Sequence, residues 1–135
     1  MRAFREAVEA GDMDAVEALL AKDVVFTSPV VFKPYPGKAI TAAILRAVSQ
    51  VFEDFRYERE LTGADGRDHA LVFAARVGDR ELTGCDFIHV DEDGLIDELT
   101  VMVRPLSGAQ ALAAAMGARF EDIAKEAEAR SASAS

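Results

Sequence analysis

The sequence has one cysteine, two histidines and no tryptophan among its 135 residues, and these shortages exclude several kinds of site. A single cysteine, Cys85, cannot form an internal disulfide, and its place in an apolar segment favours a buried, inert thiol over a nucleophile. Because His69 and His89 are the only histidines and no Cys or His pair has the spacing of zinc ligands, we expect no metal site.

Basic residues and long apolar runs are also scarce. The 15 Lys and Arg residues against 24 Asp and Glu residues give a formal net charge of −9, which argues against a nucleic-acid or anionic membrane partner. No apolar run approaches the roughly twenty residues that span a bilayer. The charged opening segment MRAFREAVEAGD matches neither a signal peptide nor an anchor, so we expect a cytoplasmic protein.

The composition indicates one globular domain, because half of the residues are apolar and 29% are charged. We place this domain at residues 1–122. Residues 123–135 read as a charged helical end followed by a disordered tail, SASAS. The sequence has no GxGxxG after a strand and no phosphate-binding loop, so no cofactor is expected.

The first half of the chain alternates helical and extended patterns. Apolar residues at helical spacing predict helices over residues 2–10, 13–20 and 38–52. Residues 24–28 are rich in β-branched side chains and predict a short strand. The segment PVVFKPYPG, residues 29–37, has three prolines and predicts a stiff loop that forms one lip of a cavity.

The second half predicts four consecutive strands and a helix. Residues 55–62 and 69–77 alternate apolar and polar side chains, and residues 80–105 contain two further apolar runs. Short turns between the strands are typical of an antiparallel meander. Residues 109–120 then have apolar side chains in one stripe, which predicts a final helix that closes over the sheet.

The two apolar runs of residues 80–105 predict a β-hairpin with its turn at Asp91-Glu92-Asp93-Gly94. Aspartate tolerates turn geometry, and glycine adopts positive φ without a Cβ clash. A calcium loop is the competing interpretation, but the sequence lacks an Asp or Asn two residues after Asp93 and a glutamate at the distance of a bidentate ligand. We therefore expect a hairpin.

One carboxylate, Asp86, lies inside the first strand of this hairpin. Strand alternation puts it on the same face as Ile88 and Val90. The returning strand adds Leu99, Val101 and Val103 to that face. A carboxylate among such groups is hard to ionise, so its pKa should rise, which makes it a pocket acid or hydrogen-bond donor. Two alternatives stay open. This strand face could instead be the one exposed to solvent, or the Asp86 carboxylate could accept a hydrogen bond from a backbone N–H of a neighbouring loop.

The order of elements resembles the nuclear transport factor 2-like superfamily, and especially its SnoaL-like branch of polyketide cyclases and ketosteroid isomerase relatives. The segments FREAVEAGDMDAVEALLAKDVVF, PYPGKAI and GCDFIHVDEDGLIDELTVMVRP carry the resemblance, which covers residues 3–120. It implies an α+β fold: a cone formed by a strongly bent, mostly antiparallel sheet around the long helix, with a C-terminal helix. Such a cone encloses an apolar cavity.

The match to ketosteroid isomerase is partial. Asp86 falls at the place of the aspartic acid that these relatives keep protonated, so that it can donate a hydrogen bond to the substrate oxyanion. The second donor, a tyrosine, falls at Phe4, and the general base, an aspartate before a proline, falls at Ser28 before Pro29. Ketosteroid isomerisation is therefore not expected.

Two other branches of the superfamily use different residues. In the cyclase branch a single pocket aspartate at the position of Asp86 is the proposed acid or base, so that chemistry stays open. The limonene epoxide hydrolase relatives use an Asp-Arg-Asp arrangement, for which Arg76 has no acid two residues beyond it. Its alternation relative to Phe73, Ala75 and Val77 predicts a solvent-facing ion pair instead.

These observations lead to two hypotheses for function. The first is a small-molecule pocket protein, in which Asp86 acts on or binds an apolar carbonyl, enol or epoxide compound. We expect the pocket to be lined also by Phe4, Val24, Phe26, Ser28, Tyr35, Phe73, Ala75, Ile88, Leu99, Val101, Val103 and Met116. The second is a non-catalytic association domain. In both, the open sheet face would pair two copies into a homodimer through Phe87, His89, Thr100, Met102 and Arg104.

Overall fold

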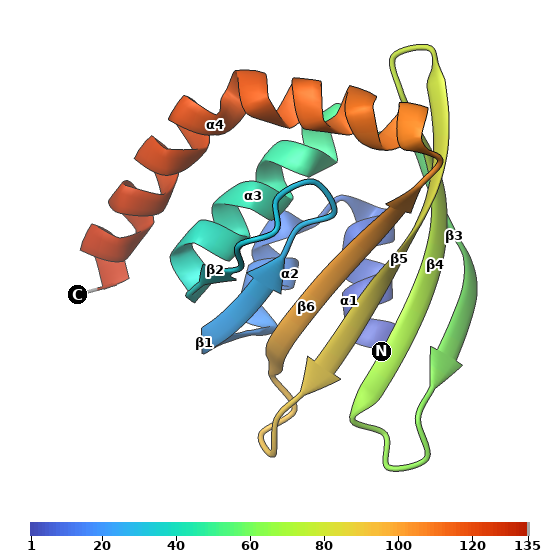
Figure 1. Cartoon of the computed structure of the whole chain (residues 1–135). Helices are drawn as coiled ribbons and strands as arrows, with labels where there is room; N and C mark the ends of the chain where they lie inside the picture. The colour runs from blue at the N-terminus through green and yellow to red at the C-terminus, as the bar shows by residue number, and fades with distance from the viewer. Residues whose placement is uncertain (135) are drawn as a thin grey trace.

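The computed structural model describes residues 1–134 and the side chains of residues 1–132, and it shows a bent sheet whose inner side faces helices (Figure 1). The helices are α1 (Arg2–Ala10), α2 (Met13–Ala18), α3 (Lys38–Val51) and α4 (Leu106–Ala134). The strands are β1 (Leu20–Thr27), β2 (Tyr35–Pro36), β3 (Glu53–Thr62), β4 (Asp68–Val77), β5 (Arg80–Val90) and β6 (Ile96–Arg104). The predicted α+β class is confirmed.

The sheet has the strand order β2-β1-β6-β5-β4-β3. Strands β3 to β6 form the predicted antiparallel meander, and β1 joins β6 in parallel. The β5–β6 turn is held by the Asp91 carboxylate, which accepts the backbone N–H groups of Asp93 at 2.9 Å and Leu95 at 3.0 Å. The predicted hairpin is therefore confirmed.

Strand β1 begins earlier than the sequence predicts. Helix α2 ends at Ala18, and Leu20 pairs with Ile96 of β6 instead of continuing the helix. The backbone N–H of Ile96 donates to the carbonyl of Leu19 at 2.8 Å, and the side chains of Leu20 and Ile96 are both buried. This pairing joins distant parts of the chain, so helical periodicity alone does not reveal it.

Helix α4 is longer than predicted. It continues through residues 123–130 and then through residues 131–134, so the predicted disordered tail is wrong there. Ser135 lies outside the described residues. The reason is tertiary: Ile123 is buried, and the guanidinium of Arg130 donates to Glu17 of α2 and to Glu126 one turn earlier. These contacts hold the charged part of α4 against the body of the protein.

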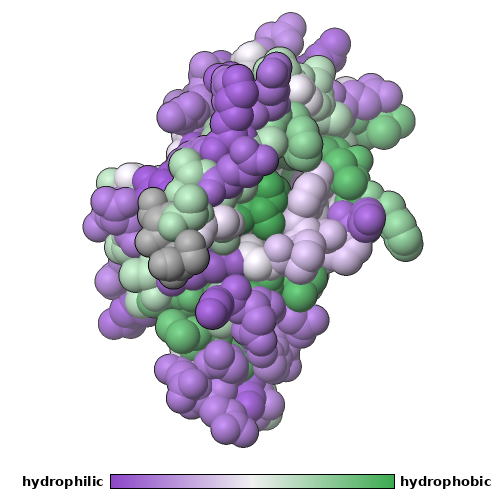
Figure 2. Space-filling view, turned by 90° about the vertical axis from the view of Figure 1, so that its left-hand side faces the viewer, coloured by the Kyte–Doolittle hydropathy of each residue, from purple (hydrophilic) through white to green (hydrophobic). Residues whose placement is uncertain are grey.

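Helix α3 lies against the inner side of the sheet, and α4 arches over it from the end of β6 (Figure 1). The buried face of α3 includes Ala42, Ala43 and Ala47, whose small side chains allow close packing. On the side of α3 and α4, apolar residues lie in a hollow surrounded by hydrophilic ones (Figure 2). None of the helices in the described part of the chain is both long and apolar enough to cross a membrane.

Candidate functional site

The concave side of the sheet, α3 and α4 enclose a cavity of about 520 Å³. This volume is in the range of sites that bind drug-sized molecules. Its wall is mostly apolar, with the following residues: Phe4, Val8, Gly11, Met13, Val16, Phe26, Ser28, Pro29, Val30, Val31, Tyr35, Ile44, Leu45, Val48, Ser49, Phe52, Phe55, Tyr57, Phe73, Asp86, Leu99, Val101, Leu112, Ala113, Met116, Gly117, Phe120 and Ile123.

A cluster of four aromatic rings forms one wall. Phe55 stacks on Phe52 and Phe73 with ring centroids 5.8 and 5.0 Å apart, and Tyr57 meets Phe55 edge to face at 4.9 Å. The position of Phe73 depends on Gly84, its partner on β5. A Cβ atom at Gly84 would overlap the Phe73 ring and stand 2.8 Å from the Met102 carbonyl oxygen, so a side chain has no room there.

Asp86 is the one carboxylate on the cavity wall among the described residues. Its side chain comes from β5 and is 8% exposed. Burial raises the pKa of Asp86 to about 7, although the hydrogen bond that it accepts from Tyr57 lowers the pKa in part. The carboxyl therefore exists in both protonation states near neutral pH.

Tyr57 on β3 is the partner of this carboxyl, because its hydroxyl donates to Asp86 Oδ2 at 2.8 Å. Burial and the negative charge of Asp86 raise the pKa of Tyr57 far above its usual range, so the hydroxyl keeps its proton. The Arg5 guanidinium lies over the Tyr57 ring, 5.8 Å from its centroid, in a cation–π arrangement. The pair is thus a fixed hydrogen-bond donor next to an acid that titrates near neutrality.

The other polar groups of the cavity wall include two serines, both of which serve the backbone. Ser28 Oγ accepts the N–H groups of Val30 at 3.1 Å and Val31 at 2.9 Å, which shapes the loop after β1. Ser49 Oγ donates to the carbonyl of Arg46 at 2.6 Å. Ser28, the position where the resemblance places a general base, therefore forms a turn and supplies no group that titrates near pH 7.

The cavity contains Asp86 and eight of the twelve other residues expected there: Phe4, Phe26, Ser28, Tyr35, Phe73, Leu99, Val101 and Met116. The prediction is wrong for Val24, Ala75, Ile88 and Val103, which are not on the wall. The first three are buried in the packed core, and Val103 packs against it. They share the strand face of the cavity residues, but other core side chains pack against them and separate them from the cavity.

Sequence reasoning missed Tyr57, whose hydroxyl donates a hydrogen bond to Asp86. A signal existed, since Phe55 and Tyr57 share the apolar face of an alternating strand. That pattern places Tyr57 on the inner face, but it does not show which strand residue it meets. Other missed wall residues include Phe52, Leu112 and Phe120.

Two predictions about residues outside the cavity can be compared with the structure. Arg76 makes solvent-facing ion pairs with Glu53 at 2.6 Å and Asp54 at 3.0 Å, as predicted. Cys85 is half-buried, and burial raises the pKa of its thiol. A raised pKa disfavours the thiolate, so Cys85 is a poor nucleophile.

Together, the bent sheet and the helices that enclose the apolar cavity on its concave side form a fold of the nuclear transport factor 2-like type. Residues 1–99 match the family model of the SnoaL-like domain, and the chain belongs to this family.

Solved structures show the same fold. The steroid delta-isomerase of Pseudomonas aeruginosa is 47% identical, with a TM-score of 0.84 over 88% of this chain and 87% of that one. An uncharacterized protein of Silicibacter pomeroyi with a cystatin-like fold is 38% identical, with a TM-score of 0.86 over 94% and 91%. An epoxide hydrolase/cyclase-like enzyme of salinomycin pyran ring formation is 18% identical, with a TM-score of 0.64 over 78% and 87%. No functionally curated protein matches the chain.

Proposed function

We propose that this protein is a cofactor-independent enzyme of isomerase, cyclase or hydrolase type that acts on an apolar carbonyl, enol or epoxide compound. In this proposal Asp86 exchanges a proton with the substrate, and Tyr57 donates a hydrogen bond beside it. The observation that carries the proposal is the buried pair itself: a carboxyl with a pKa of about 7, 2.8 Å from a tyrosine hydroxyl, in a cavity of about 520 Å³.

The pKa of Asp86 supports acid–base work because proton transfer is most effective when the catalytic pKa is near the working pH. The ionised carboxylate can accept a proton from a carbon next to a carbonyl, and the electron pair of that C–H bond then forms an enol or enolate. The protonated carboxyl returns the proton to another atom of the substrate. One acid can therefore serve both steps of a proton shift, while the apolar wall excludes water.

The steroid delta-isomerase of P. aeruginosa supports a related substrate class, since it is 47% identical to this chain. The structure limits how far its activity is transferred. Phe4 has no hydroxyl, and Ser28 is engaged by two backbone N–H groups. A steroid isomerisation here would have to rely on Asp86 and Tyr57 alone.

The test combines binding and proton exchange. Wild-type protein and the Asp86→Asn variant are incubated with steroid ketones, aromatic polyketides, terpenoid epoxides and hydroxy-ketones, and the thermal midpoint is measured. For each ketone that raises the midpoint, NMR in D₂O follows exchange of the hydrogens next to the carbonyl, and epoxides are assayed for ring opening. We expect turnover to fall about 10²- to 10⁴-fold in Asp86→Asn, the usual contribution of an acid–base group.

Asp79→Asn is the matched control, because it makes the same chemical change on a side chain that is 94% exposed. It should leave binding and turnover unchanged. If Asp86→Asn keeps full turnover, Asp86 is not the acid or base. Ligands that bind tightly without any turnover would instead support a non-catalytic binding protein.

A second candidate function is association with another copy, and the exposed sheet face favours it. On this outer face Phe87 is 42% exposed and Met102 is 58% exposed. Neighbouring apolar side chains exposed on one face often mark a protein–protein interface. In this proposal two copies pair back to back through the face. Analytical ultracentrifugation of wild type and Met102→Glu tests it: a dimer that dissociates in the variant supports the interface, and a wild-type monomer contradicts it.

A further inference from the structure

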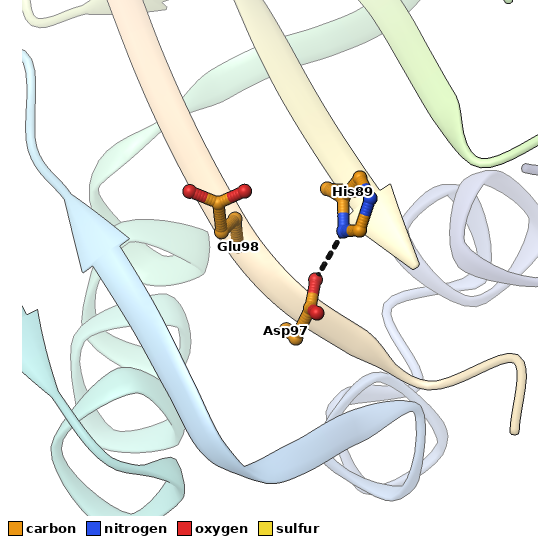
Figure 3. A group of neighbouring side chains, drawn as sticks. All are labelled: His89, Asp97 and Glu98. Atoms are coloured by element: carbon orange, nitrogen blue, oxygen red, sulfur yellow. Dashed lines mark hydrogen bonds and ion pairs between the residues drawn. The ribbon is translucent and has the colours of Figure 1, made fainter. Parts of the chain in front are cut away.

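Three side chains that can ligate a metal ion meet at the end of the β5–β6 hairpin (Figure 3). His89 comes from β5, and Asp97 and Glu98 come from β6. Their ligand atoms all lie within 4.8 Å of one another. His89 Nδ1 donates to Asp97 Oδ1 at 2.6 Å. None of the three lines the cavity, so they form a separate site.

A β-bulge creates this arrangement. His89 pairs with Glu98 and Val90 pairs with Ile96, so Asp97 is an extra residue in β6. In a regular strand Asp97 and Glu98 would point to opposite faces, but a bulge re-aims one of two neighbouring side chains. Both carboxylates therefore come close to the imidazole. Sequence spacing predicts no ligand set here because the bulge is not visible in it.

The charge around the imidazole is strongly negative. Asp68 of β4 pairs with His89 from the other side, so carboxylates approach the ring from β4 and from β6. In the described part of the chain, no Lys or Arg forms an ion pair with Asp68, Asp97 or Glu98. A divalent cation at this place would be attracted by all three carboxylates.

The ligand chemistry and the space around it select the ion. One imidazole nitrogen with carboxylate oxygens suits Zn²⁺ and similar divalent transition metals, whereas Ca²⁺ and Mg²⁺ prefer oxygen ligands alone. A shallow depression of about 400 Å³, lined in part by Asp68, His89, Glu98 and Thr100, opens beside the group. It leaves room for water to complete the coordination of an ion held by three protein ligands.

From this geometry we infer that His89, Asp97 and Glu98 bind one divalent transition cation of the Zn²⁺ class on the outer face of the sheet. The ion takes the place of the proton between His89 and Asp97, and Glu98 supplies the third ligand. It joins the last residues of β5 to the bulge of β6, and so fixes the end of the hairpin from the side opposite to the cavity.

The test is calorimetric titration of the full chain with ZnCl₂ in the Cys85→Ser background, which removes the thiol as a competing ligand. We expect one equivalent of Zn²⁺ to bind, and binding to weaken at least tenfold in His89→Gln and in Glu98→Gln. Loss of an outer-shell partner alone costs metal sites about 10- to 100-fold, so loss of a ligand should cost no less. NMR of the imidazole nitrogens should show His89, and not His69, shifted by the metal.

Two controls separate this site from general attraction to an acidic protein. Glu92→Gln makes the same change as Glu98→Gln in the neighbouring turn, and His69→Gln removes the histidine that contacts the N-terminal amine. Both should bind Zn²⁺ like the parent protein. The inference is overturned if millimolar Zn²⁺ gives no stoichiometric binding, if His89→Gln binds equally well, or if Ca²⁺ binds as tightly as Zn²⁺. None of these outcomes depends on the activity proposed for Asp86.

Discussion

Tyr57 and Asp86 are joined by a 2.8 Å hydrogen bond although the whole of β4 lies between their strands. Tyr57 pairs with Phe73 of β4, and Asp86 pairs with Leu71 of the same strand. Adjacent strands of a sheet are about 4.8 Å apart, so in a flat sheet β3 and β5 would be about twice that distance from each other. The bend of the sheet and the length of the tyrosine side chain bring the two groups together above β4.

Replacing Tyr57 by phenylalanine should raise the pKa of Asp86 further above its value of about 7. The hydroxyl stabilises the ionised carboxylate, and a hydrogen bond to a charged group contributes about 1.5–3 kcal/mol, which corresponds to about one to two pKa units. Carbon-13 NMR titration of the Asp86 carboxyl measures the change. An unchanged pKa would show that the hydroxyl does not stabilise the charge.

Asp86→Asn should stabilise the protein above neutral pH. Burial raises the pKa of Asp86 from 3.8 to about 7, so the folded protein holds this proton more tightly than the unfolded chain. The free energy of unfolding therefore keeps its full value below pH 3.8 and falls as the pH rises toward about 7, because the folded protein must then ionise a buried carboxyl. The total loss is on the order of 4 kcal/mol.

Urea unfolding of wild type and Asp86→Asn across this pH range checks the sign. The free energy of unfolding should differ little at acidic pH, and the variant should gain relative to wild type as the pH rises. Asp79→Asn is again the control and should show no such trend, because its side chain is exposed. A variant that loses stability at every pH would contradict the expectation.

Gly84→Ala should destabilise the protein and distort the cavity. The added Cβ would overlap the Phe73 ring and approach the Met102 carbonyl oxygen, so the β5 backbone or the aromatic wall must move. Overpacking of this kind costs about 1–3 kcal/mol.

Gly117→Ala is the matched control for this change. Gly117 also lines the cavity, but it lies within α4 and a Cβ there meets no atom within 4 Å. Alanine should stabilise the helix by roughly 0.5–1 kcal/mol. Thermal unfolding of both variants gives the comparison, and equal effects would show that contact with Phe73 is not the cause.

Glu17→Gln should loosen the C-terminal half of α4. The Glu17 carboxylate accepts from Arg46 of α3 at 3.0 Å and from Arg130 of α4, so it joins three helices in one ion-pair cluster. Its side chain is 25% exposed, and we expect a loss of about 1 kcal/mol. Hydrogen exchange should speed up in α4 after Phe120, while the β4–β5 amides stay protected. Glu121→Gln, on an 87% exposed side chain, is the control.

Much of the fold was accessible from the sequence because its signals are local. The Asp93-Gly94 turn, the alternation from Cys85 to Val90 and the apolar stripe of residues 38–52 each depend on residues a few positions apart. Strand alternation likewise placed Asp86 on the inner face, and an apolar face is enough to predict a raised pKa. The sequence by itself therefore determined most of the elements, the meander and the acid on the inner face of the sheet.

The tertiary structure decided which side chains meet. Ile88 and Val103 share the face of Asp86, yet Ile88 is buried in the core, Val103 packs against that core, and neither lines the cavity. The contact between Tyr57 and Asp86 needs the bend of the sheet. The contact between His89 and Asp97 needs a one-residue bulge in β6. Residues 131–134 continue α4 as a helix because Arg130 binds Glu17 of α2. Sheet curvature, strand register and helix docking arise from contacts between distant residues, so no local pattern encodes them.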